Sequence, residues 1–173
     1  MNLAIVIVGL LSVGLAPAAT QGISDPEIAS IVVTANQVDI DAGKLATSRA
    51  AHAEVRTFAQ LMVTDHTGVN KAASDLVARL KVTPKDNATS RSLRSDGEKN
   101  LAHLRTLKAM AFDRAYIDHE VAYHQQVIDA LDKALIPGAT NEELKALLIK
   151  VRPAFIAHLE HAKRLKTSIG GDR

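Results

Sequence analysis

Cysteine is absent from the 173-residue chain, and its absence excludes a whole group of functions. Thiolate nucleophiles, iron–sulfur clusters and disulfide frameworks all require cysteine, so none of them can operate here. A folded protein of this composition must be stabilised by its hydrophobic core. Because 47% of the residues are hydrophobic, the chain is long and apolar enough for one domain with a sizeable core.

Aromatic residues are also scarce, since tryptophan is absent and two tyrosines and three phenylalanines make up 3% of the chain. So few rings cannot supply a base-stacking platform, and they argue against a pocket for a large planar cofactor such as haem. An excess of one charge is lacking too, because 21 Lys and Arg residues stand against 19 Asp and Glu residues without a basic tract. We therefore expect no nucleic-acid partner.

One long uncharged apolar run is present at residues 3–19, and it ends in the small residues Ala-Pro-Ala before a threonine and a glutamine. Such a run is typical of a secretory signal peptide, which is removed from the mature protein. It is shorter than the roughly 20 residues that a membrane-spanning helix needs, so cleavage is favoured over an uncleaved anchor or an apolar cytoplasmic N-terminus. The sequence predicts a signal peptide at residues 1–19 and a periplasmic or secreted domain at residues 24–168, with no membrane span after cleavage.

Apolar residues recur at helical spacing over most of the remaining chain, in steps of three and four. Long helices are expected at residues 25–45, 51–81, 112–135 and 141–165. A weaker pattern at residues 90–108 predicts a short or less buried helix, and Thr140 with Glu143 predicts a capping box for the last helix. Strand alternation and fixed-period repeats do not occur in the sequence. The predicted fold is all-α, an antiparallel four-helix bundle with an extra short helix before the third main helix.

Three histidines occupy positions that the helical pattern would give to apolar residues: His66, His124 and His158. Chance alone would place about two of the seven histidines there, so their number proves little. Three different predicted helices each carry one, however, and a buried imidazole is costly unless it is hydrogen-bonded, ionised beside a partner or bound to a metal. Two interpretations stay open: satisfied core histidines, or an inward cluster that binds a transition-metal ion.

Carboxylates near these histidines could complete a coordination shell. Asp39 lies close to the apolar stripe of the first helix, Asp65 precedes His66, and Glu120 lies one turn before His124. Each could equally be a solvated residue at the edge of a stripe. Asp65 could also orient an imidazole instead of binding the ion itself.

Residue counting from the loop between the last two long helices gives a constraint on this site. It places His124 and His158 about 9 Å apart along the bundle, so the two are not expected to share one ion unless a proline kink alters the last helix. Glu120 is nearer the level of His158. A set of His66, Glu120 and His158, with His124 in support, is therefore as consistent with the sequence as three histidines.

The motifs of bundle enzymes are missing. Di-iron carboxylate proteins carry Glu-x-x-His on two helices, whereas Glu120 and His124 are four residues apart. Serine and threonine show no recognisable triad context. The sequence thus favours a protein that is not an enzyme, and redox chemistry at a metal is a third and weaker hypothesis.

Three segments carry a resemblance to a known family: LATSRAAHAEVRTFAQLMVTDHTGVN, AFDRAYIDHEVAYHQQVIDAL and VRPAFIAHLEHAKRL. In order and spacing, over about residues 25–166, they resemble the bacterial domain of unknown function 4142, whose members are often labelled outer-membrane or exported proteins. The family's histidines match His66, His124 and His158. Its paired acidic positions in the first helix match Asp39 and the aspartate two residues later, which are one methylene shorter than glutamate.

The resemblance implies a ferritin-like bundle exported by a Gram-negative-type bacterium, and it implies no established activity. Our leading hypothesis is an exported bundle that binds a transition-metal ion, zinc, copper or iron, through inward-facing histidines and carboxylates. The alternative is a non-catalytic structural or stress-related interaction protein whose core histidines bind no metal. The sequence names no protein partner.

Overall fold

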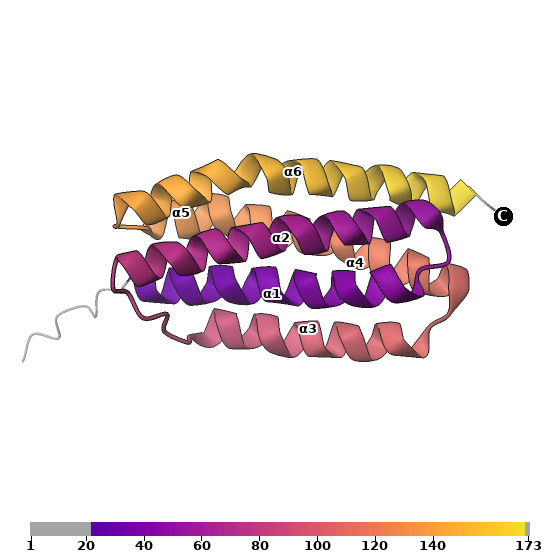
Figure 1. The fold of residues 1–173 in the computed structure, drawn as a ribbon, viewed down its shortest axis with the longest axis horizontal. Coiled ribbons are helices and arrows are strands. Elements are labelled where there is room, and N and C mark those ends of the chain that lie inside the picture. Colours follow the sequence, from indigo (N-terminus) through magenta and orange to yellow (C-terminus); the bar gives the residue numbers. More distant parts are fainter. Residues whose placement is uncertain (1–21, 172–173) are drawn as a thin grey trace, which may run out of the picture.

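The computed structural model describes residues 22–171, and all the regular elements among them are helices (Figure 1). The elements are α1 Asp25–Arg49, α2 Ala53–Arg79, α3 Ala88–Thr106, α4 Ala109–Ala130, the π-helix η1 Leu131–Leu135, α5 Ile136–Gly138 and α6 Glu142–Gly171. The all-α fold class is confirmed. Within these residues, no helix combines the length and the apolar character needed to span a bilayer. The predicted signal peptide lies outside the described residues.

The long helices run in alternating directions along the molecule, with α3 at one side and α6 at the other (Figure 1). Helix α1 packs against α2, α3 and α4, while α6 packs against α4 and α2. Because three helices surround α1, its buried residues are not confined to one stripe. This explains why Asp39, which the sequence places at the edge of a stripe, is buried.

The apolar core is divided into two clusters by a layer of polar side chains. In α1 one cluster contains residues up to Val32 and the other begins at Ala42, and in α2 the two clusters are separated between Met62 and Ala73. The gap in α4 lies between Ile117 and Ile128 among the fully buried members. The polar side chains buried in these gaps and at the matching level of α6 include six that form the polar layer: Asn36, Asp39, His66, Glu120, His124 and His158.

Helix α3 has 19 residues, as many as the predicted range 90–108 but two positions earlier, and it is less buried than its neighbours as expected. Its buried residues are Ser90, Gly97 and Leu104, seven residues apart, so a single narrow face touches the rest of the protein. At Gly97 a Cβ atom would lie 2.8 Å from the nearest Val38 methyl group. The glycine that weakens the helical pattern therefore allows α3 to approach α1 closely.

Two glycine-to-alanine substitutions should have effects of opposite sign. Gly97→Ala should destabilise the protein by about 1–2 kcal/mol, because the new methyl group overlaps the Val38 side chain. Gly68→Ala, inside α2 with open space around it, should stabilise by about 0.5–1 kcal/mol through helix propensity. Urea unfolding measures both. Equal and positive gains would contradict close packing of α3 on α1.

The start of α6 differs from the predicted capping box. The Asn141 side chain accepts hydrogen bonds from the backbone N–H groups of Glu143 and Leu144, both at 3.0 Å, and therefore caps the helix. The Thr140 hydroxyl instead donates to the Asp25 carboxylate at 2.6 Å. This contact joins the first turn of α1 to the loop before α6.

Candidate metal centre

The polar layer receives side chains from four helices. Asn36 and Asp39 come from α1, His66 from α2, and His124 from α4 beside Glu120. His158 comes from α6, and each of these six residues is at most 3% exposed. Carboxylates, an amide and imidazoles thus share a space that is closed to bulk water, where each polar atom needs a partner.

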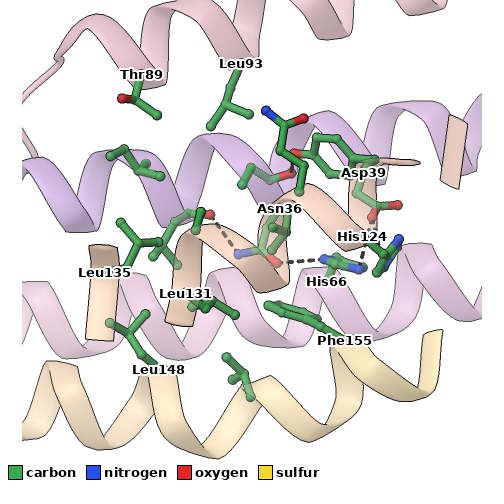
Figure 2. A pocket seen from close by; sticks show the side chains of 18 residues that line it. Asn36, Asp39, His66, Thr89, Leu93, His124, Leu131, Leu135, Leu148 and Phe155 are labelled. Atoms are coloured by element: carbon green, nitrogen blue, oxygen red, sulfur yellow. Dashed lines mark hydrogen bonds and ion pairs between the residues drawn. The ribbon is translucent and has the colours of Figure 1, made fainter. Parts of the chain in front are cut away.

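Asn36 fixes the proton position of His66. The Asn36 amide Nδ2 donates to the Val32 carbonyl at 2.8 Å, so its Oδ1 is the acceptor for His66 Nδ1 at 2.7 Å (Figure 2). Because Nδ1 donates this bond, the neutral imidazole carries its lone pair on Nε2. That Nε2 atom is buried and makes no hydrogen bond to any described residue.

The other two imidazoles are held in the same way. His124 Nδ1 donates to the Glu120 carbonyl oxygen at 3.0 Å, which leaves the lone pair on Nε2. His158 Nε2 donates to Asp65 Oδ2 at 2.9 Å, which leaves the lone pair on Nδ1. Neither His124 Nε2 nor His158 Nδ1 has a hydrogen-bond partner among residues 22–171, and both are buried. An outer nitrogen held by oxygen and a free inner nitrogen is the arrangement of metal-binding histidines.

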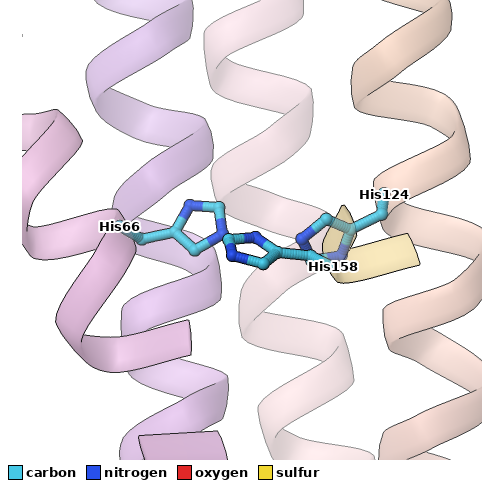
Figure 3. Close-up of side chains that lie close together, drawn as sticks. All are labelled: His66, His124 and His158. Carbon is cyan, nitrogen blue, oxygen red and sulfur yellow. The ribbon is translucent and has the colours of Figure 1, made fainter. Parts of the chain in front are cut away.

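The rings of His66, His124 and His158 lie close together (Figure 3). The ring centroids are 5.5 Å apart for His66 and His124, and 5.4 Å apart for each of the other two pairs. One nitrogen from each ring lies within 4.8 Å of the others. The expectation that His124 and His158 lie at different levels is wrong.

The error has a physical cause in the connection between α4 and α6. The helical path of α4 continues through η1 and α5 to Gly138, three residues beyond the predicted end, and α6 begins at Glu142. Counted from these ends, His124 and His158 differ by two residues, or about 3 Å of helix. Apolar periodicity does not reveal a π-turn, so this turn could not be predicted from the sequence.

Asp39 is the carboxylate closest to the free imidazole nitrogens. Its Oδ2 lies 3.1 Å from His66 Nε2 and 3.6 Å from His124 Nε2. Two ligand atoms that are each bound at 2.0–2.1 Å to a tetrahedral ion are about 3.3 Å apart, so these separations fit one ion. Both oxygens are buried without a hydrogen bond inside the described part of the chain. Asp39 thus lies against two of the three histidines, and it forms a second possible metal-binding group with Glu120 and His124.

The other two predicted carboxylates take different positions. Glu120 is fully buried, and one of its oxygens lies within 4.8 Å of ligand atoms of Asp39 and His124, on one side of the histidine cluster. Its Oε2 is 3.4 Å from His124 Nδ1. Asp65, with a side chain 39% exposed, lies at the rim and contacts the outer nitrogen of His158. Asp65 therefore occupies the orienting position that the sequence left open.

Burial sets the protonation of the layer. It lowers the pKa of His66 to about 2, with the neighbouring imidazoles adding to the effect, and it lowers the pKa of His158. Burial raises the pKa of Asp39 well above its usual range, helped by the Glu120 charge, and raises the pKa of Glu120 to about 8. The neutral imidazoles of His66 and His158 are ready to bind a metal, and a divalent ion would balance the two carboxylate charges once their protons leave.

Two further residues of the centre escaped the sequence analysis. Asn36 precedes Asp39 by three residues on α1 and holds His66, as described above. Phe155 precedes His158 by three residues, and its ring stacks on His66 with 5.1 Å between centroids and 4° between planes. Asn36 could have been found because it is a polar residue three positions before a candidate ligand, on the same side of the helix. Phe155 is apolar, and nothing in the sequence marks it as part of the centre.

A comparison with protein-family models identifies the family of this chain. Residues 12–165 match the model described as Domain of unknown function (DUF4142). The chain belongs to the DUF4142 family. No curated protein and no solved structure shows significant similarity to it. The resemblance read from the sequence is confirmed, and the family description assigns no activity.

The matched segments of this DUF4142 protein also contain residues with a structural role. Asp113, in the same segment as Glu120 and His124, is fully buried. Its carboxylate accepts hydrogen bonds from the backbone N–H groups of Ala51 at 3.0 Å and His52 at 2.7 Å, at the start of α2. Asp113 therefore fixes the α1–α2 connection and takes no part in the metal centre.

Proposed function

We propose that this DUF4142 protein is an exported, ferritin-like four-helix bundle that binds one transition-metal ion in its polar layer. Two observations carry the proposal. One nitrogen of each of the buried rings of His66, His124 and His158 lies within 4.8 Å of the others, and each ring also has one buried nitrogen without a hydrogen-bond partner among the described residues. Imidazole suits zinc, copper and iron, and these are the metals to test. The proposed function is metal binding, and no reaction is assigned.

The proposed ligands come from the two groups of side chains that could hold an ion: His66 with His124 and His158, and His124 with Asp39 and Glu120. The three histidines bind the ion, Asp39 is the nearest carboxylate ligand, at 3.1 Å from His66 Nε2 and 3.6 Å from His124 Nε2, and Glu120 lies beside it. One divalent ion offsets the charges of both carboxylates. This balance favours a single ion over two, since a second ion would leave a net positive charge in a dry core.

The bundle and its location form the rest of the proposal. Helices α1, α2, α4 and α6 make the four-helix bundle, and α3 lies outside it as part of the crossing from α2 to α4. The apolar run at residues 3–19 supports export by cleavage of residues 1–19. The metal centre would then operate in the periplasm or in the medium.

The alternative is a structural protein with core histidines and no metal. It accounts for the outer contacts of the rings with Asn36, Glu120 and Asp65. It leaves several inner polar atoms buried without partners among the described residues, at about 1–3 kcal/mol for each group. A bound ion satisfies these groups together, so the metal-binding proposal is preferred.

Metal loading of the full-length protein tests the proposal. Dialysis against zinc, copper or iron, followed by elemental analysis, should leave one ion per chain for at least one of them. At a free concentration 1,000 times the Kd, binding stabilises by about 4 kcal/mol, or about 8–16 °C in Tm for a domain of this size. His124→Ala should abolish both effects, and His103→Ala, on the exposed face of α3, should leave both unchanged. No retained ion and no Tm rise with any of the three metals would refute the proposal.

Removal of the Asp65 carboxylate should weaken metal binding without preventing it. Asp65→Ala should lower the affinity about 10–100-fold, the usual effect of losing the group that orients a histidine ligand. Asp75→Ala is the matched control, because Asp75 is an exposed residue of α2 that pairs with Lys71. Competition titration against a coloured chelator gives both affinities. Identical values for the two variants would show that Asp65 does not position His158.

A further inference from the structure

A cavity of about 70 Å³ adjoins the metal centre (Figure 2). Five residues of the centre line one end of it: Asn36, Asp39, His66, His124 and Phe155. Away from that end, Figure 2 shows Leu131, Leu135 and Leu148 along its wall. The cavity therefore has one polar end and a long apolar remainder.

The residues that line the cavity disfavour a charged ligand. Among the described residues that line the cavity, Asp39, His66 and His124 are the only acidic or basic side chains apart from the phenol of Tyr123, and burial raises the pKa of that phenol well above its usual range. An ionic ligand would have to give up its hydration to pass aliphatic side chains that offer it no partner. The cavity thus suits an uncharged molecule.

The volume limits the size of that molecule. A single water needs about 10–15 Å³ of such space, so 70 Å³ accommodates roughly five water-sized groups. A ring or short chain of about five heavy atoms fits, and a larger metabolite does not fit without movement of the helices.

The cavity adjoins the protein surface between α3 and α4. Thr89, Leu93, Tyr123 and Gln126 line both the cavity and a neighbouring groove of the surface. Thr89 and Gln126 are exposed to solvent. The cavity and the groove therefore share part of their walls.

The π-turn supplies a second and independent pointer to this cavity. Leu131 and Leu135 are the first and last residues of η1, and both line the cavity. Single π-turns within α-helices are rare and occur frequently at functional sites. This observation does not depend on the histidines.

We propose that the cavity binds a small, uncharged, mostly apolar molecule whose polar end faces the metal centre. The inference rests on the proposed function for the metal at that end. The aliphatic wall would hold the body of the molecule, and a single donor atom would reach the ion beside Asp39 and His66. The metal centre would then recognise a neutral ligand of about five heavy atoms.

Xenon binding to crystals of the metal-free protein tests the cavity without the metal. Xenon should occupy the cavity in the wild type. Ala130→Phe, which fills the cavity from α4, should exclude it, and Ala122→Phe, the same change on the exposed face of α4, should not. Val151→Phe fills the cavity from α6 and replaces the first variant if that one does not fold. Absence of xenon from the wild-type cavity would overturn the inference.

A spectroscopic titration tests the link to the metal. Cobalt(II) serves as the metal, with pyrazole as a neutral probe of five ring atoms and azide as an anionic probe. Pyrazole should change the visible cobalt spectrum in the wild type and in Ala122→Phe, and Ala130→Phe should lose at least 10-fold in pyrazole affinity while retaining its cobalt. An azide effect as strong as that of pyrazole would overturn the neutral-ligand assignment. Failure of the proposed function is a separate outcome, in which no variant binds cobalt although xenon still occupies the cavity.

Discussion

Asp39→Asn should weaken metal binding by more than about 100-fold and at the same time stabilise the metal-free protein by about 1–3 kcal/mol. The affinity falls because the ion would lose an anionic ligand. Loss of a direct ligand should weaken binding more than loss of Asp65, which only orients His158. The gain follows because both Asp39 oxygens are buried without hydrogen bonds in the described structure. The amide of asparagine needs no proton and can donate to His66 Nε2, which lies 3.1 Å from Asp39 Oδ2.

The stabilisation by Asp39→Asn should depend on pH. Burial raises the folded-state pKa of Asp39 well above the value of 3.8 for an exposed aspartate, so the wild type loses stability as pH rises above that value. The variant lacks this loss. Its advantage in urea unfolding should therefore be absent near pH 3.5 and large at pH 7.5.

Asp41→Asn is the control for this experiment, since Asp41 lies on the same helix and contacts Gln37 at the surface. It should change neither metal affinity nor stability measurably. If Asp39→Asn bound metal as tightly as the wild type, Asp39 would not be a ligand. If the variant destabilised the metal-free protein at pH 7.5, the Asp39 carboxylate would not be an unpaired buried group.

Asp113→Ala should cost about 3–5 kcal/mol, a large share of the 5–15 kcal/mol that stabilises a domain. Two charge-assisted hydrogen bonds to the N–H groups of Ala51 and His52 would disappear, and both donors would lose their partner. The carboxylate also lies at the start of α2, where the helix dipole favours negative charge. Urea unfolding of the metal-free protein measures this loss.

Asp118→Ala provides the comparison on α4. Its exposed carboxylate pairs with Lys166 at 2.8 Å, and an exposed pair contributes at most about 1 kcal/mol. The Asp113 variant, while folded, should still bind one metal ion, because Asp113 contacts the α1–α2 connection and not the metal centre. A loss below 1 kcal/mol, or a loss of metal from the folded variant, would contradict this separation of roles.

The inward histidines could be predicted because helical periodicity is a property of the local sequence. His66, His124 and His158 each continue an apolar series in steps of three and four, and each is buried as the series requires. Asp39 was harder to place. The sequence shows one stripe on α1, whereas packing against three helices buries several faces of it, and that packing is a property of the whole fold.

The relative levels of the ligands could not be predicted, because they depend on the helix ends. Three residues of additional helix after Leu135 and the start of α6 at Glu142 bring His124 and His158 to one level. The ring of Phe155 on His66 was equally hidden, since it depends on how α6 approaches α2. Local sequence thus located the candidate ligands, and tertiary packing determined which of them meet.

The division of the core into two apolar clusters has a consequence for fluctuations of the native protein. Helices ordinarily fray from their ends, where hydrogen bonds are least protected. Here the least satisfied contacts lie at mid-length, in the layer of Asp39, Glu120 and the histidines, while apolar clusters hold both ends. In the absence of an ion, amide hydrogen exchange should therefore be faster in the middle of the long helices, at the level of the polar layer. An ion bound at that level would link the two halves of the bundle and slow this exchange.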